Sequence, residues 1–366
     1  MIMRGRSARV AIIAVFLLGI VIFGGVYYAW NTATDIFQPV SPAGEGRVIP
    51  IQIKPGETTA QIADDLQAKG LIRNALAFRV WARIKGLDSQ LQAGGYNHLN
   101  TSMTISDIID QLLNAFPDVL YVTIPEGYRI EQIAHAFASV GLVKFKEQDF
   151  LKYTKHPDQF PDAGKYPILK SIPKGDGMEG LLFPATYDIP LDGTARDVVN
   201  RMLTAFDDYV QQNGLVAKAQ ANRLSEYQMV ILASLVQREI ANIKDAPGVA
   251  GVYWNRAMNL VPNDTAGYLG SDPTVQYARD TETPPKVYWQ PLNDSGKNIA
   301  TNSPWNTYIN VGLPPTPICS PGLAVLEGAA SPTKSDYFYF FNTKNGSTVY
   351  AKTYPEFLQK YNQSSH

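Results

Sequence analysis

The sequence contains very little cysteine and histidine, and this limits the chemistry open to it. Cys319 is the only cysteine among 366 residues, so no intrachain disulfide can form. The four histidines are scattered along the chain without metal-ligand spacing: His98, His135, His156 and His366. A disulfide scaffold is therefore excluded, and we expect neither a metal ion nor a cofactor.

An excess of charge of one sign is also missing. The chain has 32 Lys and Arg against 33 Asp and Glu, a formal net charge of −1. The charges are mixed along the sequence, whereas nucleic-acid-binding proteins usually gather basic residues into a patch or stripe. Nucleic acid is therefore not an expected partner.

One long stretch has no charge at all. Residues 10–30 are dominated by small and large apolar side chains, and as a helix of about 1.5 Å per residue they would span about 32 Å, against a hydrocarbon core of about 30 Å. Basic residues precede the stretch and aromatic residues end it: Arg4, Arg6, Arg9, Tyr27, Tyr28 and Trp30. A cleaved signal peptide is the alternative, but the run exceeds a usual h-region and no small-x-small site follows it.

We therefore predict a single-pass protein of the cell (inner or cytoplasmic) membrane. Residues 1–9 would form a cytoplasmic tail, residues 10–30 the transmembrane helix, and the remainder would be extracytoplasmic. Residues 31–47 are rich in Pro and Gly with little apolar periodicity, which predicts a linker. The chain beyond it is long enough for two or more hydrophobic cores.

Two stretches of the chain repeat each other. The letters IQIKPG at 51–56 and VTIPEG at 122–127 both alternate apolar residues and end in a turn. The similarity continues at the same offset of 71 residues, the separation of Gly56 from Gly127, through three further pairs: Gln61 with Gln132, Leu66 with Phe137, and Gly70 with Gly141. A constant offset predicts a repeated strand–turn–helix unit, the second copy covering residues 121–145.

After the first copy, a helix around residues 78–84 and a strand around 93–96 complete a strand–helix–helix–strand order. This module, residues 48–118, resembles the LysM-like module of cell-wall proteins, in which a groove binds the sugar backbone of peptidoglycan. Two interpretations stay open. The modules bind glycan, or they are packing units that hold the later region at a set height above the membrane.

A predicted helix near residue 239 carries a carboxylate on its apolar face. Ser225 and Gln228 form a capping-box pattern, and four residues then recur at helical spacing: Met229, Leu232, Val236 and Glu239. Burial would raise the pKa of Glu239 toward the range useful for a general acid. The helix alone favours a simpler interpretation, in which Glu239 lies near solvent at the terminus and pairs with Lys244.

Three further segments place polar and aromatic side chains between Gly and Pro turns: residues 178–187, 271–277 and 303–315. Sugar sites need this mixture, because hydroxyl groups require fixed hydrogen-bond partners and the apolar ring faces stack on aromatic side chains. Taken singly, each segment is better explained by turn stabilisation.

Taken together and in this order, the segments resemble the membrane-bound endolytic murein transglycosylases, also called the YceG-like family. The resemblance covers nearly the whole chain and includes EGLLFPATY at 179–187, ASLVQRE at 233–239, YWNR at 253–256 and the segment 306–317. It implies an α+β fold, with the LysM-like module followed by a mixed α+β catalytic domain over residues 119–366.

The family resemblance also implies a reaction. Such enzymes cleave the β-1,4 bond between N-acetylmuramic acid and N-acetylglucosamine without water and leave 1,6-anhydromuramoyl ends. Glu239 matches the glutamate of the family motif, so the resemblance assigns it as catalytic acid and then base, which reverses the interpretation from the helix alone. Expected partners are peptidoglycan glycan strands, the membrane through one N-terminal helix, and cell-wall synthases.

Six other side chains in the polar segments are candidates for substrate binding: Glu179, Tyr187, Asp272, Trp305, Asn306 and Tyr308. The two carboxylates suit positioning or stabilisation of oxocarbenium-like charge. Asn306 and Tyr308 suit hydrogen bonds to N-acetyl or hydroxyl groups, and Tyr187 and Trp305 suit stacking on sugar rings. The last four alternatively hold the loops in place.

The chain departs from the family pattern at three places. It inserts residues 262–268 and lacks an amide side chain in LGSD at 269–272, Trp305 stands where Tyr is common, and residues 353–361 lack a histidine often found there. These differences affect substrate contacts, not the acid/base. A non-catalytic peptidoglycan-binding scaffold of the synthesis machinery, or a hydrolase with the same fold, remains an alternative.

Overall fold

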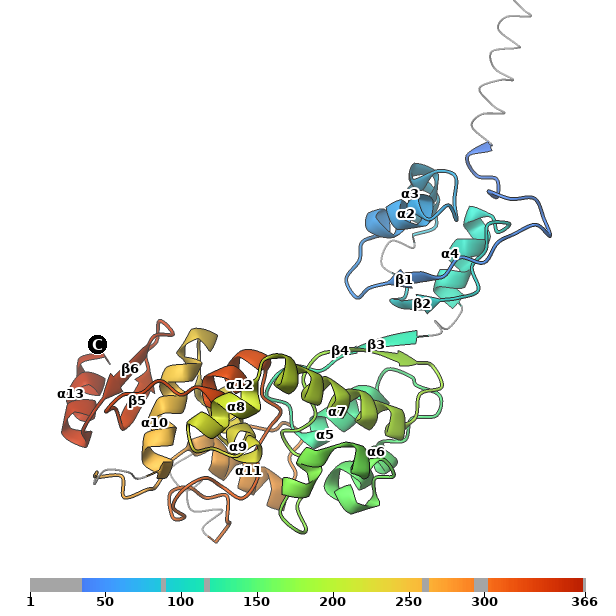
Figure 1. The fold of residues 1–366 in the computed structure, drawn as a ribbon. Coiled ribbons are helices and arrows are strands. Elements are labelled where there is room, and N and C mark those ends of the chain that lie inside the picture. Colours follow the sequence, from blue (N-terminus) through green and yellow to red (C-terminus); the bar gives the residue numbers. More distant parts are fainter. Residues whose placement is uncertain (1–34, 87–89, 115–118, 259–262, 293–301, 365–366) are drawn as a thin grey trace, which may run out of the picture. The chain divides into compact units, whose positions relative to one another are not determined.

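The computed structural model describes residues 35–86, 90–114, 119–258, 263–292 and 302–364 (Figure 1). The chain divides into two compact units, the first ending at Tyr121 and the second beginning at Val122. Helices and sheets occur together, as expected for an α+β fold. The predicted transmembrane helix, residues 10–30, lies outside the described residues, and none of the helices that are described is long and apolar enough to cross a membrane.

The first unit has the strand–helix–helix–strand order that the sequence predicts. Its elements are β1 (Ile51–Ile53), α2 (Thr59–Ala68), α3 (Ala75–Ile84), β2 (Gly94–Tyr96) and α4 (Ile105–Asn114). β1 and β2 are antiparallel, with Ile51 opposite Tyr96. The apolar faces of the helices pack with the strands into one core that includes Ile62, Leu66 and Phe78. Part of the predicted linker also lies on this unit, since the Ser41 N–H donates to the Thr101 carbonyl oxygen at 2.8 Å.

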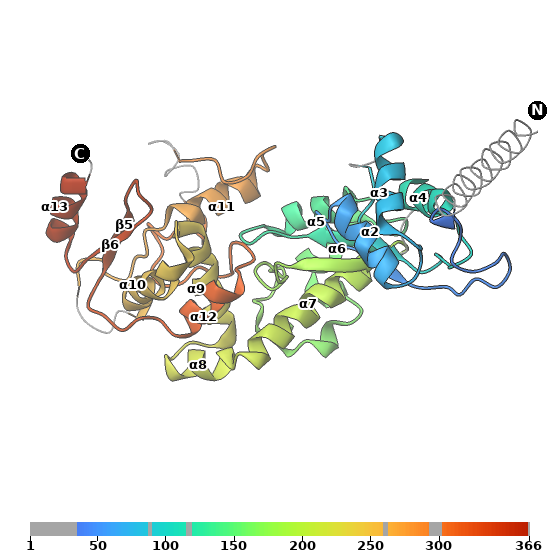
Figure 2. The same ribbon diagram turned by 90° about the horizontal axis from the view of Figure 1, so that it is seen from above.

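The second unit begins within β3 (Val119–Thr123) and is mainly helical. Its first part contains α5 (Ile130–Ala138), α6 (Glu147–Lys155), β4 (Thr186–Pro190), α7 (Ala195–Gln212) and α8 (Leu215–Ala221), with short 3₁₀ turns at Pro157–Gln159, Ala163–Lys165 and Pro167–Ser171. Its second part contains α9 (Glu226–Glu239), a 3₁₀ turn at Ile243–Asp245, α10 (Ala246–Met258), α11 (Asp272–Glu282), α12 (Leu323–Ala330), β5 (Tyr339–Asn342), β6 (Thr348–Ala351) and α13 (Tyr354–Ser364). In Figures 1 and 2, α9 and α12 lie between the α5–α7 region and the β5–β6–α13 end of this unit.

The predicted repeat has matching local geometry in its two copies. In the first, the Thr58 N–H donates to the Gln61 side-chain oxygen at 2.8 Å, and in the second the Arg129 N–H donates to the Gln132 side-chain oxygen at 3.2 Å. Each pair closes the first turn of its helix, α2 or α5. The turns that precede and follow the helices use glycines with positive φ in both copies: Gly56, Gly70, Gly127 and Gly141.

Helix α9 forms the centre of the second unit. The capping box predicted at its start is present, because the Ser225 N–H donates to Gln228 Oε1 at 2.9 Å and the Gln228 N–H donates to Ser225 Oγ at 3.1 Å. Every residue from Met229 to Val236 is buried, so this middle part of the helix is enclosed on all sides. Neighbouring α10 approaches its surroundings closely at Gly251, where an added Cβ would lie 2.3 Å from the Thr333 carbonyl oxygen.

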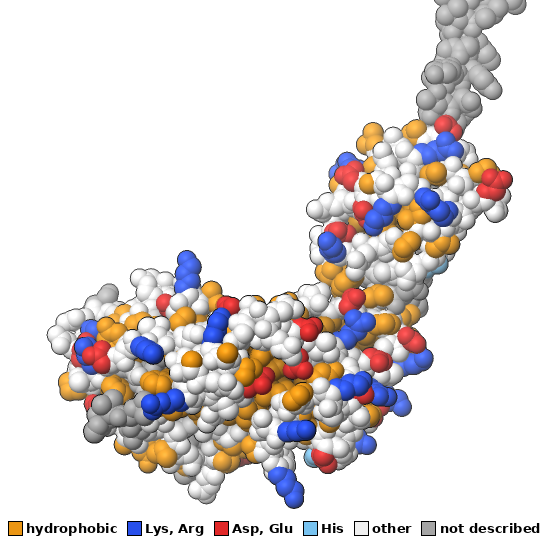
Figure 3. Space-filling model, in the orientation of Figure 1, with side chains coloured by type: hydrophobic (Ala, Val, Ile, Leu, Met, Phe, Trp, Pro, Cys, Tyr) orange, Lys and Arg blue, Asp and Glu red, His pale blue; other side chains and the backbone are white. Residues whose placement is uncertain are grey.

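The surface of the second unit carries charges of both signs. Figure 3 shows Lys and Arg interspersed with Asp and Glu over the visible face, with hydrophobic side chains between them. No stripe of one sign is visible on this face, in agreement with the mixed charge pattern of the sequence.

Candidate active site

Glu239 is the last residue of α9 and is held by two hydroxyl groups. Its Oε1 accepts hydrogen bonds from the Tyr253 hydroxyl at 2.7 Å and from Ser271 Oγ at 2.8 Å. Both donors are almost fully buried. Among the described residues the carboxyl group is bonded by these hydroxyls and not by Lys244, the partner that the helix pattern alone favoured.

Three different elements bring these groups together. Tyr253 is on α10, and Ser271 immediately precedes α11, where its N–H donates to Thr307 Oγ1 at 3.0 Å. The third element is β5, whose Asn342 donates its side-chain N–H to the Glu239 carbonyl oxygen at 2.7 Å. That bond satisfies one of the carbonyl groups left unpaired at a helix C-terminus. The position of Glu239 therefore depends on packing that is distant in sequence.

The surroundings of Glu239 favour its protonated form. Burial is the main cause that raises the pKa of its carboxyl group, and the negative charge of Asp272 raises it further. The C-terminal end of α9 acts in the same direction, because the helix dipole is unfavourable for a carboxylate there. The hydrogen bonds from Tyr253 and Ser271 and the charge of Arg256 oppose this rise but do not cancel it.

Glu239 lines an open pocket of about 1010 Å³. Polar lining residues near it include Tyr253, Arg256 and Asp272. The other large group of lining residues is aromatic and comes from β5 and α13: Tyr339, Phe340, Phe341, Tyr354, Phe357 and Tyr361. The pocket thus combines a partly desolvated acid with hydrogen-bonding groups and ring faces, which is the composition that a sugar site needs.

Of the six substrate-binding candidates, Asp272 and Tyr308 line this pocket. The Tyr308 hydroxyl donates to Asp272 Oδ1 at 2.5 Å, which holds the Asp272 carboxylate at the N-terminus of α11. Burial and the Asp272 carboxylate both raise the pKa of the Tyr308 hydroxyl. These two residues are therefore close enough to Glu239 to contact the same substrate.

Glu179 lies in another environment, buried among the side chains that surround Arg129. Its carboxylate oxygens accept the Ile130 N–H at 3.2 and 3.4 Å. The Arg129 guanidinium is fully buried and lies 4.2 Å from the ring centroid of Tyr277. Burial, together with the charge of Glu131, raises the pKa of Glu179 to about 8, although Arg129 opposes the shift. This carboxyl group helps to build the core beside α5 and is not part of the Glu239 pocket lining.

Three more candidates are also absent from that lining. The Tyr187 hydroxyl is buried and donates to the Phe183 carbonyl oxygen at 2.5 Å. The Trp305 indole N–H donates to Thr316 Oγ1 at 2.9 Å. Asn306 is buried and accepts the Tyr308 N–H at 3.0 Å, which shapes the loop that carries Tyr308. Their observed contacts fit the alternative that they hold loops in place.

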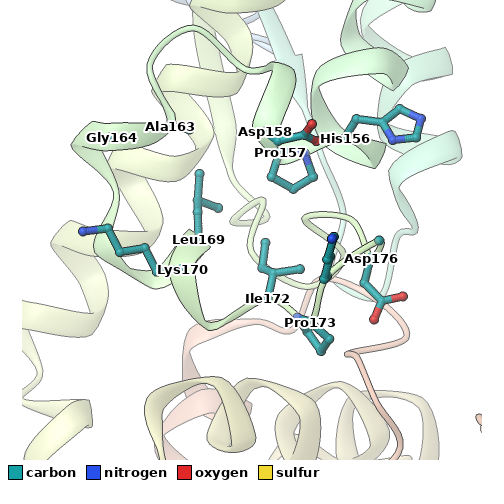
Figure 4. A pocket seen from close by; sticks show the side chains of 12 residues that line it. His156, Pro157, Asp158, Ala163, Gly164, Leu169, Lys170, Ile172, Pro173 and Asp176 are labelled. Atoms are coloured by element: carbon teal, nitrogen blue, oxygen red, sulfur yellow. The ribbon is translucent and has the colours of Figure 1, made fainter.

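Another cavity, of about 580 Å³, is lined by residues between α6 and β4. Figure 4 shows Leu169, Ile172 and Pro157 around it, with His156 and Asp176 at its edge. Among the residues that line this cavity, no carboxyl group is held by two hydrogen-bond donors in the way that the carboxyl group of Glu239 is. Within the described ranges, no group of three or more His, Cys, Asp or Glu side chains is arranged to hold a metal ion.

The model of the YceG-like family matches residues 51–363, which is most of the chain. The chain belongs to the YceG-like family. It is 30% identical over 344 residues to the endolytic murein transglycosylase of Bacillus subtilis, covering 92% of this chain and 89% of the relative. It is also 31% identical to the endolytic murein transglycosylase of Streptococcus pneumoniae over 89% of this chain, and spans 60% of that longer relative.

The fold of this YceG-like protein is similar to a solved structure as well. The crystal structure of a putative YceG-like protein from Listeria monocytogenes matches with a TM-score of 0.56 and 28% identity, over 86% of this chain and 100% of the other.

Four groups that this YceG-like protein places around Glu239 are without a predicted role. Tyr253, Ser271 and Arg256 lie in the family-like motifs, whereas Asn342 lies outside them. A signal for Tyr253 was available, since a Tyr on a helix of buried small residues needs a hydrogen-bond partner for its hydroxyl. No local pattern identifies Asn342, because its bond to the Glu239 carbonyl oxygen links residues 103 positions apart.

Proposed function

We propose that this YceG-like protein is an endolytic murein transglycosylase. It cleaves the β-1,4 bond between N-acetylmuramic acid and N-acetylglucosamine in nascent glycan strands and leaves 1,6-anhydromuramoyl ends. Two relatives that match most of the chain carry the name endolytic murein transglycosylase. The observation that carries the proposal is the carboxyl group of Glu239, partly desolvated, held through one oxygen by two donors, and lining a pocket large enough for several sugar rings.

The hydrogen bonds to Glu239 support separate tasks for its two oxygens in this proposal. Because Oε1 already accepts two O–H groups, a proton on the carboxyl group resides on Oε2. Oε2 donates this proton to the glycosidic oxygen as its bond to the muramoyl C1 breaks, and the N-acetylglucosamine end leaves as an alcohol. The raised pKa of Glu239 keeps this proton available at higher pH than for an ordinary glutamate.

The same carboxyl group then acts as a base. The carboxylate removes the proton from the muramoyl C6 hydroxyl, whose oxygen forms a bond to C1 and closes the anhydro ring. Glu239 returns to its protonated state, so no water molecule is consumed. Tyr253 and Ser271 stabilise the carboxylate between the two steps, because both donate to it.

Asp272 is the second carboxylate of the proposed site. Its charge suits stabilisation of the oxocarbenium-like C1 in the transition state, and Tyr308 fixes its orientation. The membrane helix at residues 10–30 and the LysM-like character of residues 48–118 belong to the same proposal. They would hold the catalytic unit on the outer side of the cell membrane, near newly made glycan and its synthases.

Product analysis of a Glu239→Gln variant tests the proposal. Gln keeps the size of the side chain but cannot exchange a proton, so we expect a folded protein that forms no anhydromuropeptides from un-crosslinked glycan, as read by mass spectrometry. A matched control is Glu282→Gln, at an exposed position on α11, which should leave the products unchanged.

Each other outcome supports a different function. Anhydro products at an undiminished rate from the Glu239→Gln variant would overturn the catalytic assignment. Reducing N-acetylmuramic acid ends in the products of the parent protein would indicate a hydrolase. Glycan binding without any cleavage by the parent would favour the non-catalytic scaffold.

A further inference from the structure

One wall of the Glu239 pocket is a row of aromatic rings on α13. Tyr354, Phe357 and Tyr361 follow each other at spacings of three and four residues, so they share one helix face. Their rings are nearly parallel: Tyr354 and Phe357 are inclined by 14° with centroids 6.0 Å apart, and Phe357 and Tyr361 by 19° at 5.8 Å. All three line the pocket. We call these three residues the aromatic ladder.

The ladder is exposed although it is firmly supported. Tyr354 and Tyr361 keep 50% and 47% of their surface accessible. The buried Phe341 of β5 makes edge-on contacts with Phe357 and Tyr361, at centroid distances of 5.7 and 5.2 Å. Lys360 further fixes α13 by donating to the Tyr350 carbonyl oxygen of β6 at 2.8 Å. The rings are thus presented to solvent on a rigid base, without being buried in a core of their own.

The ladder is also fixed relative to the proposed acid. β5 supports it through Phe341, and the next residue, Asn342, donates to the Glu239 carbonyl oxygen. The two residues that bind the ladder and the acid are therefore adjacent in one strand. A ligand that reaches Oε2 of Glu239 and extends along the pocket meets these rings.

The chemistry of this wall fits saccharide rings. Exposed, pre-positioned aromatic faces cost little entropy on binding and stack on the apolar faces of pyranoses. The pocket volume of about 1010 Å³ is at the upper end for small-molecule sites, so it has room beyond the two sugars that flank one scissile bond. Asp264 lines the same pocket and accepts the Tyr354 N–H at 3.2 Å, so the carboxylate beside the ladder suits the hydroxyl and amide donors of an N-acetylhexosamine ring more than an anionic ligand.

We infer that the aromatic ladder is a saccharide subsite that binds N-acetylhexosamine rings of the glycan away from the scissile bond. This inference rests on the proposed function, because the continuity of the ladder with Glu239 identifies the occupant. Because this subsite lies away from the scissile bond, only long strands reach it, so the enzyme favours long strands over short ones. The ladder thereby selects where along a strand Glu239 acts, and takes no part in proton transfer.

The test measures binding separately from cleavage. The parent for this test is the full chain carrying Glu239→Gln, and Tyr354→Ala and Tyr361→Ala are added to it one at a time. Binding is measured by calorimetric titration with two ligands built of N-acetylglucosamine and N-acetylmuramic acid, an un-crosslinked octasaccharide and a disaccharide. We expect each alanine variant to bind the octasaccharide about threefold to tenfold more weakly, with little change for the disaccharide. Tyr354→Phe and Tyr361→Phe should bind like the parent, since they keep the ring face.

The matched control is Gln359→Ala, an exposed residue of α13 that does not line the pocket, which should leave binding unchanged. With Glu239 intact, Tyr361→Ala should raise KM for long strands and leave kcat nearly the same. If the alanine variants bind the octasaccharide as tightly as the parent, or if the parent does not bind it, the aromatic ladder is not a saccharide subsite. Continued cleavage by the Glu239→Gln protein would instead overturn the proposed function alone.

Discussion

A carboxyl group that first donates a proton and then accepts one must be stable in both forms near the working pH. The surroundings of Glu239 provide this balance through opposed effects. Burial and Asp272 favour the neutral acid, whereas Tyr253 and Ser271 favour the carboxylate. Removing one hydroxyl donor therefore changes the balance without removing the acid.

Tyr253→Phe tests this balance. Loss of its hydrogen bond removes a contact that lowers the pKa of Glu239, so this pKa rises further. If the protonated acid is the active form, activity is lost as pH rises through that pKa. We therefore expect the alkaline limb of kcat/KM to move to higher pH and kcat to fall roughly tenfold, as for loss of one hydrogen bond to a charged group.

The control for this experiment is Tyr268→Phe, which changes another tyrosine of the same pocket that is not bonded to Glu239 in the part of the chain described. Its alkaline limb should coincide with that of the parent. An unmoved limb in Tyr253→Phe, with only the rate reduced, would mean that Tyr253 acts through packing alone.

The raised pKa of Glu179 predicts a pH effect on the stability of the fold. Its pKa is raised from 4.5 to about 8 in the folded chain, mainly by burial. Between these values the unfolded chain has released the proton while the folded chain retains it, so the free energy of unfolding falls as pH rises from about 4.5 to 8. At about 1.4 kcal/mol for each pKa unit, the loss is on the order of a few kcal/mol.

Glu179→Gln should remove this fall, because the amide is neutral at every pH and still accepts the Ile130 N–H. Urea unfolding between pH 5 and pH 8.5 should show the variant losing less stability with rising pH than the parent. The exposed Glu282→Gln should follow the parent curve. Parallel curves for Glu179→Gln and the parent would contradict a raised pKa at this site.

The residues that could be predicted from the sequence are those marked by a motif. Glu239 and Asp272 lie in one pocket with Tyr308, as the motifs suggested, because each sits at the end of a helix or in a loop that faces it. Glu179 belongs to a motif of equal prominence but is enclosed beside Arg129. A motif does not distinguish a carboxylate that faces a pocket from one that holds a core together, since both need fixed surroundings.

At the scale of elements, the position of α10 decides where Tyr253 lies. Gly251→Ala would place a Cβ 2.3 Å from the Thr333 carbonyl oxygen, so α10 has to shift. We expect a loss of about 1–3 kcal/mol in stability, as for overpacking, together with reduced activity from displacement of Tyr253. Thermal unfolding and product formation measure the two effects.

Gly164→Ala is the matched control, because an added Cβ there meets nothing within 4 Å. It should preserve both stability and activity. A fully active and stable Gly251→Ala protein would mean that α10 adapts without moving Tyr253.

Elements with strong local signals were predictable, and those built by distant contacts were not. The repeat and the capping box of α9 follow from hydrogen bonds within one helical turn, such as that between Ser225 and Gln228. The role of the β5–β6–α13 end could not be predicted, because it depends on Asn342 reaching Glu239 and on rings of α13 meeting Phe341. These contacts join residues that carry no shared local pattern.

At the scale of the whole molecule, residues 10–30 would decide where the proposed enzyme works. A membrane tether limits the volume that the catalytic unit explores and raises its effective concentration near emerging glycan. The test is a secreted version, in which a cleavable secretion signal replaces residues 1–31. We expect this version to cut isolated glycan normally in vitro. In cells that depend on it, we expect glycan strands longer than normal. An unrelated single-pass helix in place of residues 10–30 is the matched control, and it should restore normal strand length, measured by chromatography of glycan strands. Full restoration by the secreted version would mean that the helix only delivers the protein, and that the specificity for nascent strands resides in the pocket and its aromatic ladder.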